Sequence, residues 1–589
     1  MLDNFGDGLR GRGSSSFMDS SELRKKFLEF FEKRGHTVVP SNSLIPSDPS
    51  VLFTTAGMQQ FKEYFLGEKS PYGFNVASCQ KCFRTSDIEE VGDEKHLTFL
   101  EMLGNFSFGD YFKKEAIKLA YELLISNLQL PISKMIVTVF KGNTEVPRDE
   151  ESVKIWGKLG FSEEKGNLKF CGREDNFWGP TGGEGPCGPT TEIHFNGVEV
   201  WNLVFNEYYR NKKNELSSLK QKGVDTGMGL ERLAMVAQQK PSVYETDLFF
   251  PIVKEIRDRR GTGEGQSLKS ERIIADHIKG SVFLAAEGIF PSNVEKGYVL
   301  RRILRRAIRF GRLLDLPKGF LIPLAQKVIE IYKDIYPEVK SKEADILTVI
   351  QSEEEKFEKT LEKGLKNSKL QIENCKLKNL KIISGKVAFD LFQSYGFPLE
   401  LSREIAREND LEINEKEFEE EFKKHQEISR AGVEKKFGGV GKEATYEGTR
   451  LHTATHLLHA ALREILGKHV KQMGSDITPQ RLRFDFSYPQ KLTDKEIKKV
   501  ENLVNQKIKE DLEVKKEEMN YQEAIKQGAL AFFREKYPPV VTVYSINNFS
   551  KEICAGPHVK RTSELGHFGI LKEESSGAGV RRIRAILVK

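Results

Sequence analysis

The chain has 589 residues, a length that corresponds to about three or four domains. Hydrophobic residues make up 38% of it and charged residues 30%, which excludes an intrinsically disordered chain. No run of about 18 apolar residues occurs, so we expect no membrane span. The 92 basic and 86 acidic residues give a net charge of +6, which neither requires nor excludes a nucleic-acid partner.

Cysteine content and the first residues predict the compartment. Six cysteines are too few for a disulfide framework, so we expect a cytoplasmic protein in a reducing environment. Residues 1–18 contain glycines and serines but no apolar run of the kind found in a signal peptide. They are predicted to form a flexible N-terminal tail.

The predicted elements between residues 19 and 255 mix helices with strands. An apolar face over 21–31 predicts the first helix, and β-branched and aromatic residues predict strands at 136–140 and 198–209. Residues 175–195 contain five glycines and three prolines, a composition typical of a loop that lets a ligand approach the backbone. This part of the chain therefore predicts an antiparallel α+β domain.

Helical periodicity dominates from residue 256 to about 440. Glycines at 263 and 265 suit a domain boundary near the start of this region. Residues 410–436 predict a charged, solvent-facing helix, and the glycine-rich residues 436–448 predict a linker. A last domain then spans 441–589.

Residues 296–314 carry seven basic side chains and no acid. Four of the arginines recur at helical spacing and form one stripe, opposite an apolar side. A solvated surface helix normally has acids interspersed among its bases, so this composition favours contact with a phosphate backbone, of RNA or of DNA. The candidate nucleic-acid contacts are Arg301, Arg302, Arg305, Arg306, Arg309 and Arg312.

Two short motifs about a hundred residues apart could share a metal ion. His452 and His456 are four residues apart in a helical pattern, so both imidazoles lie on one face. Cys554 and His558 lie four positions apart in a Gly/Pro turn and could complete a tetrahedral zinc site with three nitrogens and one sulfur. Unrelated histidines and a thiol are the alternative. His459 could compete as a ligand, but a position at the surface or behind the metal ligands suits it better.

Two further motifs have simpler explanations. Cys79 and Cys82 form a C-x₂-C pair without a second pair, so two reduced cysteines beside a strand are favoured over zinc. Residues 224–232 combine an acid, two glycines and an arginine at the entry of a predicted helix, which suits an anionic ligand with an amino group nearby. They lack the phosphate-loop pattern, and on spacing alone an ordinary helix start is favoured.

Together, the longer motifs resemble alanyl-tRNA synthetase, a class II aminoacyl-tRNA synthetase, from residue 20 to 589. Residues 27–67 and 82–112 resemble the family's opening and its motif 2, and DTGMGLER resembles motif 3. Residues 275–309 resemble the acceptor-stem region, and HTATHLLHAAL, KQMGSDI and CAGPHVKRTSELG resemble the editing domain.

The resemblance implies a multidomain α+β fold. A class II antiparallel sheet flanked by helices is expected at 19–255, a helical domain for tRNA acceptor-stem recognition with its linker at 256–440, and an α+β editing domain at 441–589.

The implied activity is ligation of alanine to the 3′ end of alanine tRNA, with ATP and its Mg²⁺. Arg84, in motif 2, would hold the alanine carboxylate against the α-phosphate, Asp225 would bind the alanine ammonium group, and Arg232 would lie beside adenine and the phosphates. The residues implied to form the methyl pocket are Met102, Trp178 and Val204, with Asn202 and Gly227 beside them.

The resemblance also implies a second, hydrolytic site. A pocket for a methyl group cannot strongly reject the hydroxyl of serine, nor fully exclude glycine. His452, His456, Cys554 and His558 match the family's zinc-bearing editing motif, which acts on mischarged seryl- and glycyl-tRNA. Gln472 matches a polar position of that site.

The sequence departs from the family pattern in three respects. It lacks the β-barrel before HTATH and an extension after the editing core, so we expect a monomer that contacts mainly the acceptor stem. The positions that recognise the acceptor-stem wobble pair carry Arg312 and Gln393 instead of Asn and Asp. The turn Cys-Ala-Gly-Pro-His replaces Cys-Gly-Gly-Thr-His, which removes a backbone donor and a hydroxyl and leaves editing activity to be tested.

Two alternative functions use the same scaffold. One is an editing deacylase with an inactive synthetase domain, and the other is a non-catalytic RNA-binding protein. Retention of Arg84, Asp225 and Arg232 disfavours the first, and retention of the methyl-pocket residues disfavours the second.

Overall fold

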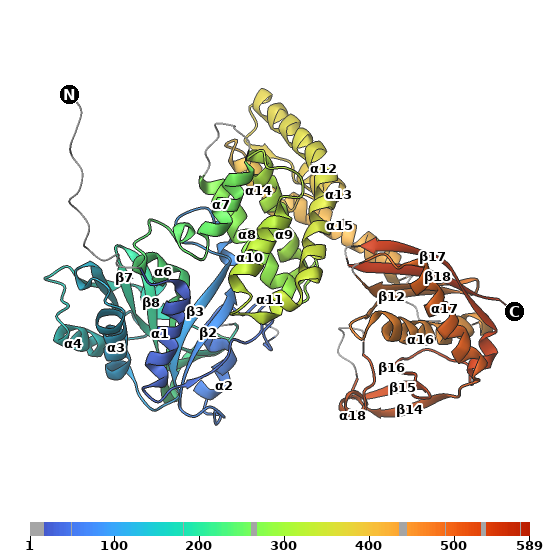
Figure 1. Ribbon diagram of the computed structural model, residues 1–589, viewed down its shortest axis with the longest axis horizontal. Helices are drawn as coiled ribbons and strands as arrows, with labels where there is room; N and C mark the ends of the chain where they lie inside the picture. The colour runs from blue at the N-terminus through green and yellow to red at the C-terminus, as the bar shows by residue number, and fades with distance from the viewer. Residues whose placement is uncertain are drawn as a thin grey trace, which may run out of the picture. The chain divides into compact units, whose positions relative to one another are not determined.

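The computed structural model describes residues 17–48, 50–180, 182–260, 268–434, 445–488, 490–531, 538–577 and 579–588. They divide into two compact units, the described residues of 17–289 with 293–354, and those of 290–292 with 355–588 (Figure 1). The predicted tail up to residue 16, the boundary at 263–265 and most of the predicted linker lie outside the described residues. No helix in the described part of the chain combines the length and the apolar character needed to cross a bilayer.

The first unit is built on a mixed nine-stranded sheet. Its order is β1-β2-β3-β9-β8-β7-β4-β5, with β6 added to β7, and only the β1–β2 and β4–β5 pairs are parallel. The predicted strands at 136–140 and 198–209 are confirmed as β4 and β8. The strands are β1 (Thr37–Val38), β2 (Asn75–Phe83), β3 (Phe99–Ser107), β4 (Met135–Phe140), β5 (Leu168–Cys171), β6 (Phe177–Trp178), β7 (Gly185–Phe195), β8 (Val198–Arg210) and β9 (Leu216–Gly229).

The predicted first helix is confirmed as α1 (Ser20–Glu32), which contacts β2 and β3. It begins after Asp19, whose carboxylate caps the helix by accepting from the Glu22 amide at 2.7 Å. Leu23, Phe27 and Phe31 are fully buried on the face that packs against the sheet. The other helices of this unit are α2 (Lys62–Phe65), α3 (Lys113–Tyr121), α4 (Glu150–Lys158), α5 (Arg173–Asn176), α6 (Leu230–Ala237), α7 (Phe250–Arg259), α8 (Leu268–Ala286), α9 (Glu295–Leu313), α10 (Leu321–Tyr332) and α11 (Pro337–Ser341).

The loop predicted at 175–195 is wrong for most of its length, because β6 and β7 occupy it. The β7–β8 register shifts between Cys187 and Thr190, so Pro189 lies where the regular ladder is interrupted. A proline, which has no N–H, is tolerated at such a bulge. Beyond it, β7 pairs with both β8 and β4. The glycines and prolines thus mark an irregular strand.

The second unit begins with a helical region that contains part of α12 (Glu343–Leu377). The predicted helix at 410–436 starts later than expected, at Glu415, because β11 precedes it and pairs with β10. Asp410, with φ of 57°, turns the chain before that strand. The elements are β10 (Ile382–Ile383), α13 (Gly385–Tyr395), α14 (Leu399–Arg407), β11 (Glu412–Ile413) and α15 (Glu415–Glu434).

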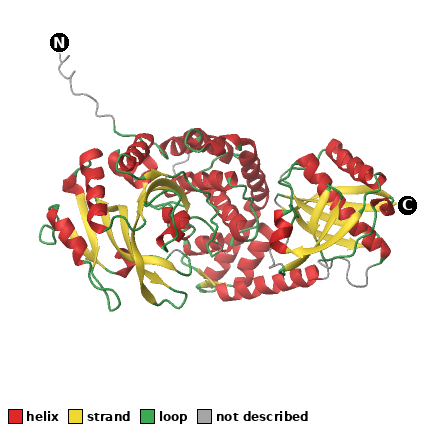
Figure 2. Ribbon diagram, turned by 90° about the horizontal axis from the view of Figure 1, so that it is seen from below, coloured by secondary structure: helices red, strands yellow, loops and turns green. Residues whose placement is uncertain are grey.

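The rest of the second unit combines two sheets with helices, so strands and helices occur in both units and the α+β class is confirmed (Figure 2). Leu457, Leu458, Phe484 and Val500 belong to its core. The four-stranded sheet contains β12 (Gln472–Thr478), β13 (Arg481–Ser487), β18 (Val580–Val588) and β17 (His567–Gly577), and the three-stranded sheet contains β14 (Val514–Asn520), β15 (Val540–Ile546) and β16 (Ser550–Ile553). The helices are α16 (Tyr446–Leu466), α17 (Asp494–Lys509) and α18 (Tyr521–Lys526).

A buried ion pair joins α1 to the central sheet of the first unit. The Arg24 guanidinium donates to both oxygens of Glu101 on β3, at 3.0 and 2.7 Å. The Tyr336 hydroxyl donates to the same carboxylate at 2.9 Å. Glu101 is fully buried and Arg24 is 8% exposed, so neither charge has water as an alternative partner.

We predict that Glu101→Gln lowers the free energy of unfolding of this unit by roughly 3–5 kcal/mol, because Arg24 is left buried without a carboxylate. The three tryptophans of the chain, Trp156, Trp178 and Trp201, all lie in the first unit, so urea unfolding followed by their fluorescence measures this change. Glu29→Gln is the matched control, since Glu29 is partly exposed on the same helix and its pairs with lysines contribute less than about 0.5 kcal/mol. Equal effects of the two substitutions would contradict the prediction.

Candidate functional site

Three neighbouring strands place most of the predicted pocket residues on one face of the sheet. Val204 of β8 lies opposite Asp225 of β9, and Asn202 lies opposite Gly227. Met102 of β3 lies opposite Gly229, two residues further along β9. Directly opposed residues of antiparallel strands share a face, and so do residues two apart on one strand. The register therefore brings these five predicted residues together.

Close packing shapes the apolar part of this pocket. A Cβ atom on Gly227 would lie 3.0 Å from the Met102 sulfur, so a side chain here would displace Met102. Trp178 reaches the same apolar cluster from β6, which pairs with β7 at Gly188. The Gly57 amide donates to the Met102 sulfur at 3.3 Å. Met102 and Val204 are 8% and 4% exposed, so the apolar surface that they form beside Asp225 is largely buried.

Asp225 supplies the charge of the pocket. Its side chain is buried, and burial raises the pKa of its carboxyl to about 7 from the ordinary 3.8. Within the described residues, no lysine, arginine or hydrogen-bond donor contacts this carboxylate. A buried acid in this state favours a bound cation, and a primary ammonium group fits a carboxylate acceptor beside an apolar pocket.

Arg84 follows directly after β2, at the edge of the same region. Its backbone amide donates to the Thr98 carbonyl at 2.8 Å, and its Nε donates to the Thr55 carbonyl at 3.3 Å. The side chain is half-buried. Because only Nε is engaged by these bonds, the terminal nitrogens have the geometry to bind anionic oxygens.

Arg232 lies in the first turn of α6, three residues after the end of β9. Its Nη1 donates to the Glu199 carboxylate at 2.8 Å and to the Glu199 carbonyl at 3.1 Å. Glu199 has 38% of its side chain exposed. The sequence analysis did not identify this partner, because no local motif connects residues 33 positions apart.

The acid-free helix predicted at 296–314 is α9, and acids from other elements neutralise part of it. Arg301 and Arg305 both contact the buried carboxylate of Glu353 on α12, at 3.2 and 2.5 Å. Arg302 pairs with Glu89 at 3.2 Å. The stripe is therefore less positive than the sequence of α9 alone indicates.

The remaining arginines of α9 differ in exposure. Arg306 is buried and donates to the Ile88 carbonyl at 2.7 Å, and Arg309 is 3% exposed. Arg312, near the end of the helix, is exposed. Of the six predicted contacts, Arg312 thus has the surface position that binding a phosphate backbone requires.

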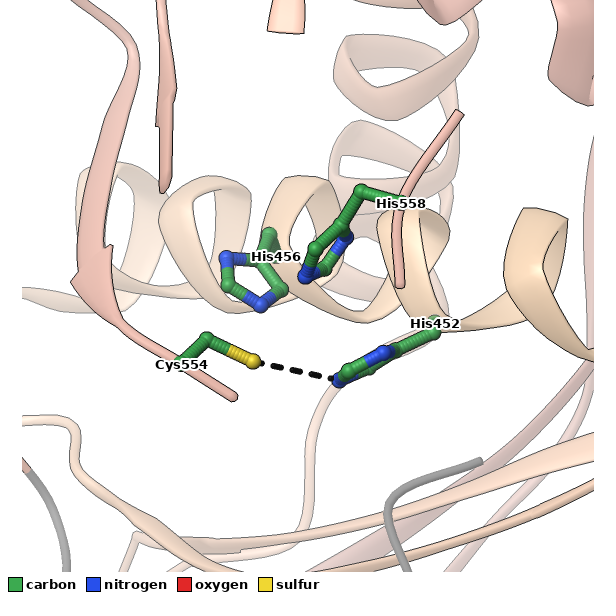
Figure 3. Close-up of side chains that lie close together, drawn as sticks. All are labelled: His452, His456, Cys554 and His558. Atoms are coloured by element: carbon green, nitrogen blue, oxygen red, sulfur yellow. Dashed lines mark hydrogen bonds between the residues drawn. The ribbon is translucent and has the colours of Figure 1, made fainter. Parts of the chain in front are cut away.

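The second unit brings the four predicted metal ligands together (Figure 3). One ligand atom from each of His452, His456, Cys554 and His558 lies within 4.8 Å of the others. The two helical histidines belong to α16, and the other two residues belong to the turn after β16. The Cys554 sulfur lies 3.4 Å from His452 Nε2. Three imidazoles and one thiol are a donor set typical of zinc.

Protein acceptors next to the imidazoles define which nitrogens face the cluster. His452 Nδ1 lies 3.2 Å from the Pro557 carbonyl, so Nδ1 carries the proton and Nε2 is a free acceptor. His558 Nδ1 lies 3.1 Å from the Thr453 hydroxyl, and the buried His558 Nε2 has no hydrogen-bond partner among the described residues. An orphaned buried nitrogen that faces other donors fits a metal ion.

Proton binding to the imidazoles does not compete strongly with metal binding at this cluster. Burial lowers the pKa of His452 to about 4, and it lowers the pKa values of His456 and His558 as well. Burial also raises the pKa of Cys554 to about 11, so the thiolate needs a cation nearby to form at neutral pH. The cluster thus consists of neutral groups that a divalent cation could bind.

Three other residues singled out in the sequence, Gln472, Gln393 and His459, do not belong to the four-residue cluster. Gln472 begins β12, where its amide donates to the Ser475 hydroxyl at 3.2 Å. Gln393, on α13, lies 3.4 Å from His425 Nε2. His459 is fully buried and is not part of the four-residue cluster.

Cys79 and Cys82 are buried free thiols on β2, as the simpler explanation predicted. They are three positions apart on a strand, so their side chains point to opposite faces and do not converge on one ion.

Family comparisons agree with this architecture. The model described as tRNA synthetases class II (A) matches residues 22–465, and the model for the second additional domain of threonyl and alanyl tRNA synthetases matches residues 541–584. The first match spans well over half of the chain, so the chain belongs to the class II tRNA synthetases.

Curated relatives define the family more closely. Alanine–tRNA ligase from Borrelia hermsii is 48% identical over 97% of this chain and 100% of the relative, and the Treponema denticola enzyme is 49% identical over 96% and 98%. The chain is therefore a member of the alanine–tRNA ligase family. A pyrrolysyl-tRNA synthetase structure from Desulfitobacterium hafniense, with a TM-score of 0.24 and 15% identity over 38% of this chain and 71% of that chain, is too distant to add to this assignment.

The relatives differ in how much of their own length this chain matches. The relative from Thermotoga maritima is 40% identical over 97% of this chain but only 80% of its own length. That alignment extends over 706 residues, more than the 589 of this chain, so the relative carries segments absent here. The Borrelia hermsii relative matches over its whole length.

The raised pKa of Asp225 predicts how stability depends on pH. The native carboxyl binds its proton more tightly than the unfolded chain does, so the free energy of unfolding falls as the pH rises from about 4 to about 7. Asp225→Asn removes this penalty, and at pH 8 we expect the variant to be more stable than wild type by roughly 1–4 kcal/mol.

Urea unfolding at a series of pH values measures this difference through tryptophan fluorescence. The two proteins should converge near pH 4, where both carry a neutral side chain. A difference that does not change with pH would contradict the pKa assignment. Asp258→Asn, an exposed acid on α7, is the control.

Proposed function

We propose that this chain activates alanine with ATP and transfers it to the 3′ end of alanine tRNA. The observation that carries the proposal is the buried carboxylate of Asp225, which lacks a cationic partner in the described structure and lies beside Met102 and Val204. The alanine ammonium group would satisfy Asp225, and the methyl group would contact Met102, Val204 and Trp178. Asn202 and Gly227 would border the bound amino acid.

The first step joins two anions, so charge neutralisation is its main requirement. The alanine carboxylate oxygen attacks the α-phosphorus of ATP, a P–O bond forms, and pyrophosphate leaves. Arg84 would bridge the carboxylate and the α-phosphate with its terminal nitrogens. Mg²⁺ would enter with ATP as part of the substrate complex.

The nucleotide would compete with an acid of the protein for Arg232. In the proposed complex, the phosphates and adenine take the place of the half-exposed Glu199 beside this guanidinium. In the second step, a hydroxyl at the 3′ end of the tRNA attacks the activated carbonyl, and AMP leaves. Positioning and electrostatic stabilisation suffice for both steps, without a covalent enzyme intermediate.

Recognition of tRNA is proposed to involve α9. Arg312 is the exposed candidate, and Arg301, Arg302 and Arg305 could contact phosphates if these compete with Glu353 and Glu89. Arg306 and Arg309, being buried, would support the helix rather than bind tRNA directly. The monomeric state expected from the sequence and the cytoplasmic location stay predictions.

The second unit is proposed to hydrolyse mischarged seryl- and glycyl-tRNA. His452, His456, Cys554 and His558 would hold a zinc ion, which when bound supplies a Lewis acid and an anchor for the tRNA end. Gln472, at the start of β12, would offer an amide to the aminoacyl group. Pro557 replaces a hydroxyl-bearing residue of the family turn, but its carbonyl still orients His452.

For the synthetic site, we predict that wild type catalyses alanine-dependent ATP–pyrophosphate exchange and that Asp225→Ala and Arg84→Ala each lower it by roughly 10²–10³-fold. The reason is that each variant loses a charge that stabilises the bound substrates or the transition state. Asp258→Ala should exchange like wild type, because Asp258 pairs only with Lys254 on the surface of α7 among the described residues. No exchange with alanine, or wild-type exchange by Asp225→Ala, would refute the proposal.

For the hydrolytic site, Cys554→Ala should abolish deacylation of seryl-tRNA and lower the bound zinc, because the cluster loses its only sulfur ligand. Alanine-dependent exchange should stay at the wild-type level, since Asp225 and Arg84 are unchanged. Cys375→Ala, a buried cysteine of α12 outside the cluster, is the control. If wild type and Cys554→Ala hydrolyse seryl-tRNA equally, the editing function is excluded.

A further inference from the structure

A buried acid lies directly behind the four-residue cluster. Glu552 on β16 is 4% exposed and precedes Cys554 by two residues. Its Oε2 lies 3.4 Å from His456 Nδ1, and its Oε1 lies 2.8 Å from His459 Nδ1. Within the described part of the second unit, no lysine or arginine lies within ion-pair distance of this carboxylate. Among the described residues, the polar side chains in contact with this acid are the two imidazoles and the Ser550 hydroxyl.

A buried carboxylate in such surroundings requires compensation. Transfer of a carboxylate out of water without a cationic partner costs several kcal/mol. Glu101, by contrast, meets the Arg24 guanidinium directly. Among the described residues, Glu552 thus lacks the direct guanidinium partner that Glu101 has, and its closest side-chain partners are imidazoles.

The three histidine ligands have different partners behind them. His452 faces the Pro557 carbonyl, and His558 faces the Thr453 hydroxyl, both of which are neutral acceptors. His456 alone faces a carboxylate. At 3.4 Å its Nδ1 is within ion-pair distance but does not meet the geometry of a hydrogen bond, so this contact is the loosest of the three.

His459 explains why Glu552 can act on a single ligand. Its Nδ1 holds Oε1 of the acid by the shorter contact, and its ring packs against Phe484 in the core. This leaves Oε2 directed at His456. The arrangement corresponds to the carboxylate–histidine–metal relay, in which an outer acid orients the ring and increases the basicity of the ligand nitrogen.

Charge counting leads to the same conclusion. A divalent ion bound by one thiolate and three neutral imidazoles leaves a net charge of +1 in a buried site. One carboxylate next to the ligands balances it. Glu552 has the burial, the position and the charge for this role.

We propose that Glu552 is a positioning residue of the metal site, which orients His456 through Nδ1 and balances the charge of the bound ion. The inference rests on the proposed metal site and goes beyond it by assigning a residue that is not itself a ligand. Removal of the charge should weaken metal binding without removing any ligand atom.

The test compares zinc affinity in full-length wild type, Glu552→Gln and Glu517→Gln by competition with a chromophoric chelator. Glu517 is an exposed acid of β14, so its substitution removes the same charge away from the cluster. We expect Glu552→Gln to bind zinc 10–100-fold more weakly, as is typical for loss of an outer-shell acid, and Glu517→Gln to match wild type. Thermal unfolding of the metal-free proteins should show that all three are folded and that Glu552→Gln is at least as stable as wild type.

Zinc affinity of Glu552→Gln within threefold of wild type would overturn the inference. If Glu552→Gln does not fold, Glu552→Asp replaces it, because aspartate keeps the charge but withdraws it from His456. Weaker zinc binding by a stably folded Glu552→Asp supports the role, and unchanged binding refutes it. A wild type that binds no zinc would refute the proposed metal site itself, which distinguishes the two failures.

Discussion

The antiparallel register of β3, β9 and β8 is the constraint on which the synthetic site depends. Side chains alternate between the two faces of a strand, so a slip of one residue would exchange Asp225 for Thr226 in the pocket. Several contacts on the opposite face hold the register. Trp201, opposite Met228, packs against Phe27 and Phe31 of α1, with ring centroids 5.9 and 6.4 Å apart. The helix that buries the reverse of the sheet thus also fixes which side chains line the pocket.

Polar contacts reinforce this register directly behind Asp225. The Thr226 hydroxyl donates to the side-chain oxygen of Asn105 at 2.7 Å and accepts from the backbone N–H of Asn105 at 3.0 Å. The side-chain nitrogen of Asn105 in turn donates to the Tyr111 hydroxyl, which lies 2.9 Å from Nε2 of His36. Burial lowers the pKa of His36 to about 4, so this chain of groups stays uncharged at neutral pH. A buried hydrogen-bond network of this kind helps to hold the strand that carries Asp225 in its register.

Local patterns in the sequence predicted the regular elements well, because α1, β4, β8 and α16 have clear periodicity or β-branched composition. They failed at β7, where the bulge composition resembles a loop and only pairing with β8 and β4 defines a strand. Local patterns also predicted the chemical type of the candidate residues but not the residues that contact them. Glu353 lies more than 40 residues from the arginines that it neutralises, and no pattern within α9 contains it. Glu552 was missed for the same reason, since its partners are on α16, more than 90 residues away.

Five buried acids of the structure illustrate two ways in which a buried negative charge is met. Glu101, Glu231 and Asp149 each contact an arginine or lysine at 2.9 Å or less, namely Arg24, Lys279 and Lys113. These pairs are internally complete and serve the fold. Asp225 and Glu552 have no such partner in the described residues, and each lies beside a site proposed to bind a cation, an ammonium group in one case and a metal ion in the other. Because an unpaired buried carboxylate is unfavourable in the free protein, binding of the cation recovers that energy. A buried carboxylate without a lysine or arginine partner would therefore favour a bound cation at both the synthetic and the hydrolytic site.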